Sequence, residues 1–201
     1  MNSLYDFIVE PSGSRYKNTK EVGDKELILN TSVEEYKCVN KEGLVKAIPA
    51  AIKTPIEVGD RVMIHHNVFR RFYNVKGKEQ NSRSYFKEDL YFCGIDQVYL
   101  YNKGCGWKTV LNRCFVKPIK SLSNYKIEDV EPNMGVLRYG NANLDKSNIK
   151  EGDLVSFPSR SKWEFIVDNE LLYCMKSKNI ISTHEYEGNE TEYNPSWAQG
   201  S

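Results

Sequence analysis

The chain has 201 residues, and its 28 Lys and Arg residues balance 27 Asp and Glu residues to a formal net charge of +1. That balance excludes a general electrostatic attraction to nucleic acid or to an anionic membrane, although a local basic loop is still allowed. No apolar run approaches the ~18 residues of a membrane-spanning helix.

The start of the chain lacks the basic and apolar segments of a signal peptide. The five cysteines are scattered, and no two of them are spaced as Cys-x-x-Cys. Neither a disulfide framework nor a structural zinc site is therefore expected. These features together predict a cytoplasmic protein.

The apolar residues occur in short runs rich in Val, Ile, Tyr and Phe, and Gly, Asp, Asn and Pro bound these runs. That pattern is typical of β-strands. No segment keeps a 3.6-residue apolar period over three turns, so an all-β fold is expected. In chain order, the predicted strands cover residues 5–10, 43–48, 61–65, 90–93 and 97–101, and then 113–117, 135–139, 154–157, 164–167, 171–175 and 180–182.

The two halves of the chain repeat each other. The segment Ile56–Ile64, with Gly59-Asp60 at its centre, returns as residues 149–157, with Gly152-Asp153 at the matching position. Glycine permits a positive φ at the turn, and Asp can accept hydrogen bonds from nearby backbone donors. The other echoes, in the same order, are Phe7–Pro11 with Cys114–Pro118, Glu42–Val45 with Met134–Leu137, and Leu90–Cys93 with Leu171–Cys174. A duplicated β-domain is predicted.

The repeat predicts a first domain over residues 1–106, a second over 107–184, and a polar, mobile tail over 185–201. The two copies are not equal. The first carries a long loop at 12–40 and a polar insertion at 75–86, whereas the second has a shorter loop and no insertion. Function is therefore to be sought where the copies differ.

Each copy resembles the GroES-type co-chaperonin family. In the second copy, residues 113–117 are similar to the family's opening strand, 135–140 to its glycine-containing strand, and 151–157 to its Gly-Asp strand. Residues 167–175 resemble the family segment IDNEEVLIM. The resemblance implies two tandem GroES-like small β-barrels. It also implies a non-catalytic chaperone that forms a homo-oligomeric ring and caps a GroEL-type chaperonin ring during protein folding, with ATP bound by that partner.

In this family the mobile loop carries an apolar tripeptide that docks on the chaperonin. Leu27, Ile28 and Leu29 resemble it, because they stand together inside the polar stretch 25–32. The alternative is that these three residues form an ordinary strand packed on the barrel. The matching segment of the second copy, 121–130, contains only isolated apolar residues, so we expect at most one docking element in each chain.

Two other functions are considered. A structural or assembly protein, cellular or viral, could use the barrels for subunit packing, and it would hold residues 12–40 buried and ordered. A nucleic-acid module could use Arg70, Arg71 and Lys78, which lie in a segment that also contains aromatic residues suited to base stacking. A solvated hairpin anchored by its aromatic residues is the favoured interpretation of that segment.

No catalytic motif or cofactor-binding motif is found in the sequence. His65 and His66 are adjacent, and successive side chains of a strand point to opposite faces, so the two are not expected to share a metal site. We therefore expect no enzymatic activity, no metal and no cofactor.

Overall fold

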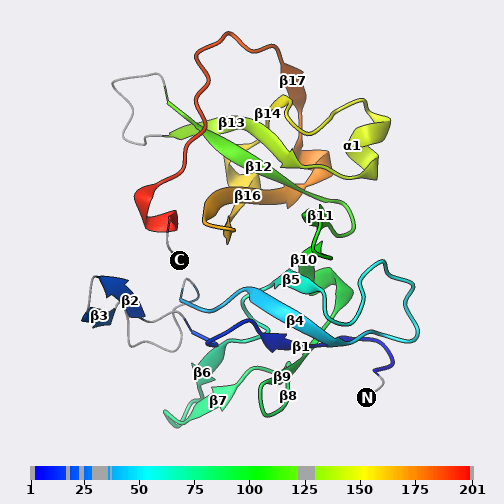
Figure 1. The fold of residues 1–201 in the computed structure, drawn as a ribbon, viewed down its shortest axis with the longest axis vertical. Coiled ribbons are helices and arrows are strands. Elements are labelled where there is room, and N and C mark those ends of the chain that lie inside the picture. Colours follow the sequence, from blue (N-terminus) through cyan, green and yellow to red (C-terminus); the bar gives the residue numbers. More distant parts are fainter. Residues whose placement is uncertain are drawn as a thin grey trace. The chain divides into compact units, whose positions relative to one another are not determined.

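The computed structural model describes residues 3–16, 19–22, 25–28, 36, 38–121 and 130–199, and over these the chain is almost entirely β-structure (Figure 1). The predicted all-β class is confirmed. The short helix α1 (Ala142–Lys146) begins after Asn141, whose side chain accepts hydrogen bonds from the backbone N–H groups of Asn143 and Leu144. Short 3-10 turns occur at Ile95–Gln97, Ser159–Ser161, Ser177–Asn179 and Ser196–Ala198. None of the described helices is long and apolar enough to cross a membrane.

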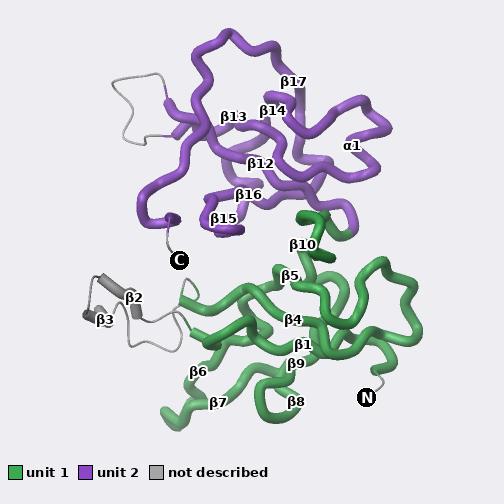
Figure 2. The backbone as a smooth tube through the Cα atoms, in the orientation of Figure 1, with its two compact units in different colours: residues 1–110 green, residues 111–201 purple. Residues whose placement is uncertain are grey.

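The chain divides into two compact units, residues 1–110 and residues 111–201 (Figure 2). The division falls slightly later than the 106/107 boundary expected from the sequence. The reason is that β11 (Trp107–Thr109) pairs with β10 (Val98–Asn102), which is a strand of unit 1. The hairpin that these strands form keeps residues 107–109 with the first unit.

Unit 1 is built on a seven-stranded antiparallel sheet with the order β11-β10-β5-β4-β1-β9-β8. Besides β10 and β11, its strands are β1 (Phe7–Pro11), β4 (Glu42–Ala47), β5 (Arg61–Ile64), β8 (Tyr85–Lys87) and β9 (Leu90–Cys93). Two further pairs of strands stand outside this sheet: β2 (Thr19–Val22) with β3 (Lys25–Ile28), and β6 (Arg71–Tyr73) with β7 (Glu79–Asn81).

Unit 2 is built on a six-stranded sheet with the order β15-β16-β12-β13-β14-β17. Its strands are β12 (Arg113–Lys120), β13 (Val130–Tyr139), β14 (Leu154–Ser156), β15 (Trp163–Val167), β16 (Glu170–Lys176) and β17 (Ser182–His184). Without β11, the sheet of unit 1 has the same order strand for strand, with β1 matching β12 and β10 matching β17. The repeat seen in the sequence is therefore also a repeat of topology.

The register of the first two strands repeats as well. Pro11 lies opposite Gly43 in unit 1, and Pro118 lies opposite Gly135 in unit 2. Each opening strand also contains an irregularity at the same place, between Ile8 and Val9 in β1 and between Phe115 and Val116 in β12. The two opening strands therefore share this irregularity of pairing as well as their register.

The pairing with the next strand corrects one detail of the sequence alignment. Val9 lies opposite Tyr91, and Val116 lies opposite Tyr173. Leu90–Cys93 therefore corresponds to residues 172–175 and not to 171–174. A shift of one residue would turn every side chain of a strand to the other face. The corrected alignment places Tyr91 and Tyr173, both buried, at the same position of the two cores.

The Gly-Asp turn has the predicted geometry in both units. Gly59 and Gly152 adopt φ values of 95° and 96°, which favour glycine. Asp60 Oδ2 accepts a hydrogen bond of 2.8 Å from the backbone N–H of Glu57, and Asp153 Oδ2 accepts one of 2.8 Å from Lys150. The predicted role of this dipeptide is confirmed.

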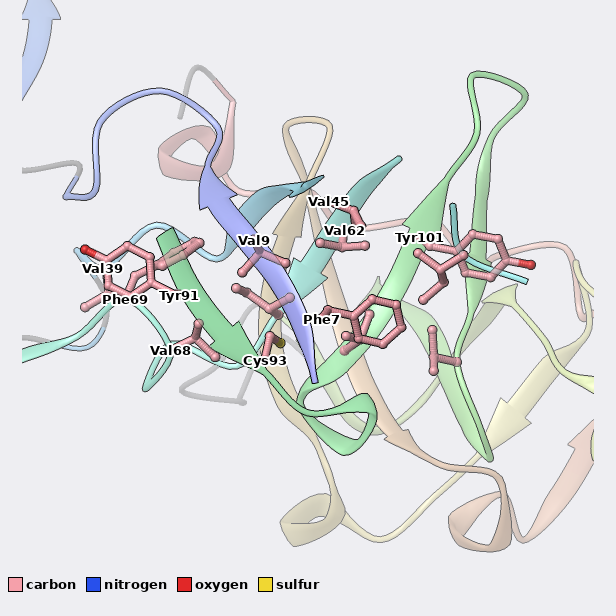
Figure 3. Packing of buried hydrophobic residues seen from close by; sticks show 14 of the residues in the cluster. Phe7, Val9, Val39, Val45, Val62, Val68, Phe69, Tyr91, Cys93 and Tyr101 are labelled. Atoms are coloured by element: carbon pink, nitrogen blue, oxygen red, sulfur yellow. The ribbon is translucent and has the colours of Figure 1, made fainter. Parts of the chain in front are cut away.

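Each unit has its own hydrophobic core. In unit 1, Phe7 and Val9 of β1 pack with Cys93 of β9 and with Val45 and Val62 (Figure 3). The core of unit 2 is formed by the matching strands and includes Cys114, Val116, Leu137, Val155, Phe157, Leu171, Tyr173 and Met175. Burying one such side chain contributes roughly 1.5–3 kcal/mol to folding. Each unit therefore has an apolar interior that does not depend on the other.

The cysteines provide a test of these cores. Cys93 of unit 1 and Cys114 and Cys174 of unit 2 are buried, whereas Cys105 is exposed. Burial raises the pKa of the Cys114 and Cys174 thiols to about 12, and it raises the pKa of Cys93 as well. Because the thiolate is the reactive form, we expect a thiol reagent to modify Cys105 rapidly in the native protein and the buried thiols only on unfolding. Mass spectrometry of the labelled peptides measures this. Rapid native labelling of Cys114 would contradict the unit 2 core.

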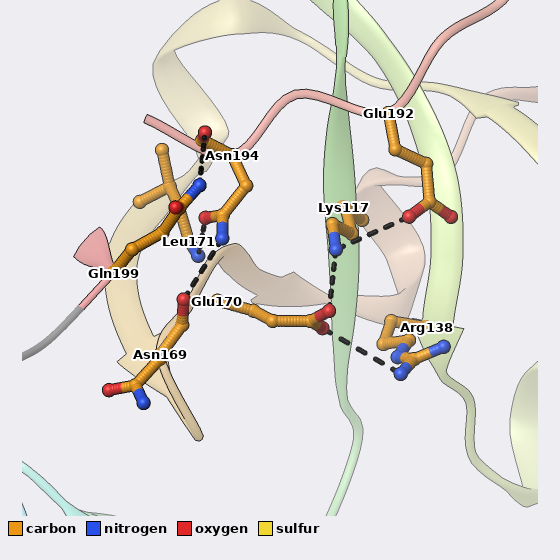
Figure 4. A network of polar contacts seen from close by, with 8 residues as sticks. All are labelled: Lys117, Arg138, Asn169, Glu170, Leu171, Glu192, Asn194 and Gln199. Atoms are coloured by element: carbon orange, nitrogen blue, oxygen red, sulfur yellow. Dashed lines mark hydrogen bonds and ion pairs between the residues drawn. The ribbon is translucent and has the colours of Figure 1, made fainter. Parts of the chain in front are cut away.

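The polar residues 185–201 do not form a separate tail over their described part, which corrects the sequence interpretation. Glu192 pairs with Ile119 in an isolated bridge, and Asn194 Oδ1 accepts a hydrogen bond of 3.0 Å from the backbone N–H of Leu171. Lys117, almost fully buried, forms ion pairs with Glu170 at 2.7 Å and Glu192 at 3.2 Å (Figure 4). This segment is polar because it supplies hydrogen bonds and charge to strands β12 and β16 of unit 2.

Candidate docking site on unit 1

The long loop of unit 1 leaves and re-enters the unit at one place. Tyr16 pairs with Val39 in an antiparallel bridge, and the backbone N–H of Asn40 donates a hydrogen bond of 3.0 Å to the carbonyl of Arg15. The buried Asn40 side chain also donates to the carbonyls of Ser12, at 2.8 Å, and Ser14, at 3.0 Å. The two ends of the loop are therefore held to each other.

Between those ends, β2 and β3 form a small antiparallel sheet of their own, with Thr19 opposite Ile28 and Lys20 opposite Leu27. Leu27 and Ile28 thus lie in a β-hairpin, and β3 is not a strand of the seven-stranded sheet. Leu29, the third residue of the predicted docking triplet, lies outside the described residues. The matching segment of unit 2 is residues 121–130, of which 122–129 lie outside the described residues as well.

The insertion of unit 1 differs from its predicted extent of 75–86. Residues 65–84 connect β5 to β8 and contain the β6–β7 hairpin, whereas residues 157–162 connect the matching strands β14 and β15 in unit 2. Tyr85 and Phe86 belong to β8, which pairs with β9 in the main sheet. The sequence placed the insertion too late because β6 and β7 are short and exposed and have no alternating apolar pattern.

The tip of the β6–β7 hairpin is an ordered turn. Asn74 Oδ1 accepts hydrogen bonds of 2.9 Å from the backbone N–H groups of both Lys76 and Lys78, and Gly77 adopts a φ of 70°. Val75 is fully exposed at this tip. An Asn that accepts local backbone hydrogen bonds, followed by a Gly with positive φ, is a stable way to reverse a chain.

The base of the hairpin is clamped to the start of the long loop. The Arg15 guanidinium donates hydrogen bonds to the carbonyls of Phe69 and Arg70 and to Asn81 Oδ1. The Tyr16 hydroxyl accepts a hydrogen bond of 2.6 Å from the backbone N–H of Arg71. Sequence reasoning missed both Arg15 and Tyr16, because an Arg-Tyr pair at the start of a polar loop has no distinguishing pattern.

The three predicted nucleic-acid residues differ in their surroundings. Arg71 forms an ion pair of 2.7 Å with Glu79 and lies over the Tyr16 ring, 4.8 Å from its centroid. Arg70 is partly buried at the base of the hairpin, whereas Lys78 is exposed at its tip. The favoured interpretation was a solvated hairpin anchored by its own aromatic residues, but Phe72 and Tyr73 are exposed, and Arg15 and Tyr16 hold the base instead.

The two adjacent histidines do not point to opposite faces, contrary to the expectation from a strand. Strand β5 ends at Ile64, so His65 and His66 lie in the turn that follows, and their rings stack with centroids 4.3 Å apart. Within the described residues, no group of three or more His, Cys, Asp or Glu side chains is arranged to hold a metal ion.

We expect His66 to make unit 1 less stable in acid. Burial, reinforced by the charges of His65, Lys41 and Arg70, lowers the pKa of His66 from 6.5 to about 4. Between those pH values the unfolded chain binds the proton and the folded ring does not, so stability falls as the pH drops from 6.5 towards 4. Because the ring is half exposed, the expected loss is only about 1 kcal/mol.

This loss is measured by urea unfolding at pH 7 and pH 4.5. The His66→Gln variant should lose that part of the pH dependence, and His184→Gln, which changes an exposed histidine of unit 2, should keep it. Equal pH dependence in both variants would contradict the assignment.

The sequence of the chain matches no family model and no curated protein. The GroES-type resemblance is therefore an expectation from the sequence motifs alone.

Proposed function

We propose that this chain is a non-catalytic, cytoplasmic co-chaperonin built from two GroES-like barrels, and that it caps a GroEL-type chaperonin ring to assist protein folding. Leu27, Ile28 and Leu29 dock on the ring. ATP belongs to the ring, and this chain needs no cofactor of its own.

The observation that supports this proposal most is the contrast between the two units. They share one strand order and one Gly-Asp turn, yet only unit 1 carries a long loop with an apolar triplet. The shared strand order therefore forms in unit 2 without a long loop, so the loop of unit 1 is not needed for the fold. The β2–β3 hairpin stands apart from the main sheet, while Asn40 and the Tyr16–Val39 bridge hold both ends of the loop in place.

The free energy of such a contact is sufficient for reversible docking. Burying one Leu or Ile side chain contributes roughly 1.5–3 kcal/mol, from which the cost of ordering the loop is subtracted. One loop is thus a weak ligand. Several chains assembled into a ring engage several subunits of the chaperonin at once, and this multivalency raises the overall affinity by orders of magnitude.

Native mass spectrometry tests the proposal. The chain is mixed with a GroEL-type ring in the presence and in the absence of ATP or ADP. We expect a complex of the two that depends on nucleotide. If the chain assembles only with itself and never with the ring, the co-chaperonin function is wrong, and the alternative of an assembly protein that uses its sheets for subunit packing takes its place.

A further inference from the structure

Two stretches of this nearly neutral chain carry a net charge of +5, residues 70–87 and residues 103–120, and in the second of them Lys103 and Lys117 form ion pairs with carboxylates. Residues 70–87, called here the hairpin segment, contain six basic residues and one acidic residue, hence a net charge of +5. The whole chain has a net charge of +1, so the rest of the chain is net negative. A local concentration of charge of this kind creates a positive potential that attracts an acidic partner.

Three cations of the hairpin segment are exposed and unpaired. Lys76, Lys78 and Arg83 are exposed, and no carboxylate of the described residues forms an ion pair with any of them. The single acidic residue, Glu79, pairs with Arg71. The charge that remains for a partner is therefore carried by the tip of the hairpin and by the turn between β7 and β8.

The segment also presents apolar surface beside these cations. Val75 is fully exposed at the tip, and the rings of Phe72, Tyr85 and Phe86 are partly exposed. Aromatic and arginine side chains are enriched among the residues that contribute most to protein–protein affinity. Because the turn at Asn74 and Gly77 is already ordered, little conformational entropy is lost when this surface binds.

The position of the segment connects it to the docking loop. Arg15 and Tyr16 hold the base of the β6–β7 hairpin through side-chain hydrogen bonds, and the same two residues begin the loop that contains Leu27 and Ile28. Tyr16 also pairs with Val39, where the loop returns. Unit 2 has only residues 157–162 in place of the hairpin. The hairpin segment and the docking loop, which distinguish unit 1 from unit 2, are therefore connected through Arg15 and Tyr16.

We propose that the hairpin segment is a second docking element, which binds an acidic surface beside the apolar groove that receives Leu27-Ile28-Leu29 on the same chaperonin ring. This inference rests on the proposed function. The cations steer the ring towards unit 1, and the hairpin adds a charged contact to the apolar contact of the loop. A nucleic acid is the weaker candidate, because Arg71 is paired with Glu79 and Arg70 is partly buried, so that of these three basic residues only Lys78 is both exposed and outside an ion pair with the described carboxylates.

The test compares two variants with the same change of net charge. One carries Lys76→Gln, Lys78→Gln and Arg83→Gln in the hairpin segment. The matched control carries Lys146→Gln, Lys150→Gln and Lys178→Gln, which are exposed in unit 2. With nucleotide present, we expect the hairpin variant to bind a GroEL-type ring about tenfold more weakly and with less dependence on salt, and the control to bind like the unchanged chain.

The outcomes separate this inference from the proposed function. If the unchanged chain and the hairpin variant bind the ring equally well at all salt concentrations, the inference is wrong and the proposed function stands. If the unchanged chain binds no ring, both are wrong. If a single-stranded oligonucleotide binds the unchanged chain, fails to bind the hairpin variant and displaces no ring, the segment is a nucleic-acid site and the inference is again overturned.

Discussion

Replacing Leu27, Ile28 and Leu29 together by serine is expected to weaken binding to a GroEL-type ring by at least about 100-fold. Each buried aliphatic side chain contributes roughly 1.5–3 kcal/mol, and 1.4 kcal/mol corresponds to a factor of ten in affinity. Loss of three such contacts at every loop of a multivalent complex reduces the overall affinity further. Fluorescence anisotropy or native mass spectrometry with nucleotide present measures the change.

The matched control removes the same kind of side chain from three positions that are exposed in the structure. Val58, Leu111 and Ile181 are exposed in the structure, and their joint replacement by serine should leave ring binding unchanged. Buried thiols that remain protected in both variants show that the two units are still folded. If the Leu27/Ile28/Leu29 variant binds the ring as tightly as this control, the docking assignment is wrong.

Gly135→Ala is expected to destabilise unit 2 by about 3 kcal/mol, which is a large effect for a single methyl group. A Cβ at Gly135 would lie 2.5 Å from the carbonyl oxygen of Lys117 and 2.6 Å from Val116 Cγ1. Both atoms belong to β12, whose position is set by pairing with β13 and β16. The two central strands would have to separate to accommodate the methyl group.

The duplication provides the control for this substitution. Gly43 occupies the same position in unit 1, but its Cβ would lie 3.0 Å from the carbonyl of Glu10 and 3.3 Å from the Phe69 ring. Gly43→Ala should therefore cost less, about 1–2 kcal/mol, and should affect unit 1 alone.

Thiol labelling distinguishes the two substitutions. At a fixed urea concentration, Gly135→Ala should expose Cys114 and Cys174 about 100-fold faster, as expected for 3 kcal/mol. The labelling of Cys93 should stay unchanged in that variant, whereas Gly43→Ala should accelerate it. Equal acceleration of all three thiols would show that the units do not unfold separately.

Most strands of the main sheets could be predicted from the sequence, because their buried residues form short apolar runs. The segments that contain Val9, Val62, Val116 and Val155 were all assigned as strands, and each of these residues is buried. Strand β11 was missed although its Trp107 is buried, because it directly follows the glycine-containing turn at residues 103–106. Strands β6 and β7 were missed because they are largely exposed. Strands β6 and β7 form by pairing with each other, and a segment without alternating apolar residues does not indicate such a pairing.

The candidate site was accessible to sequence reasoning only in part. Leu27, Ile28 and Leu29 are conspicuous because three apolar residues in a polar stretch are unusual. The contribution of Arg15 could not be predicted, because its partners are Asn81 and the carbonyls of Phe69 and Arg70, which are distant in the sequence. The tail was misjudged for the same reason, since a polar residue such as Glu192 is stabilised by the buried charge of Lys117.

The sequence by itself determined the all-β class, the duplication and the Gly-Asp turns, because hydrophobic alternation and positive φ are local properties. Only the tertiary structure decided the exact alignment of Tyr91 with Tyr173, the extent of the insertion, and the joining of the hairpin to the loop at Arg15 and Tyr16. These features depend on which backbone groups meet across the chain. Strand register and long-range hydrogen bonds are set by the whole packed unit, so no local pattern encodes them.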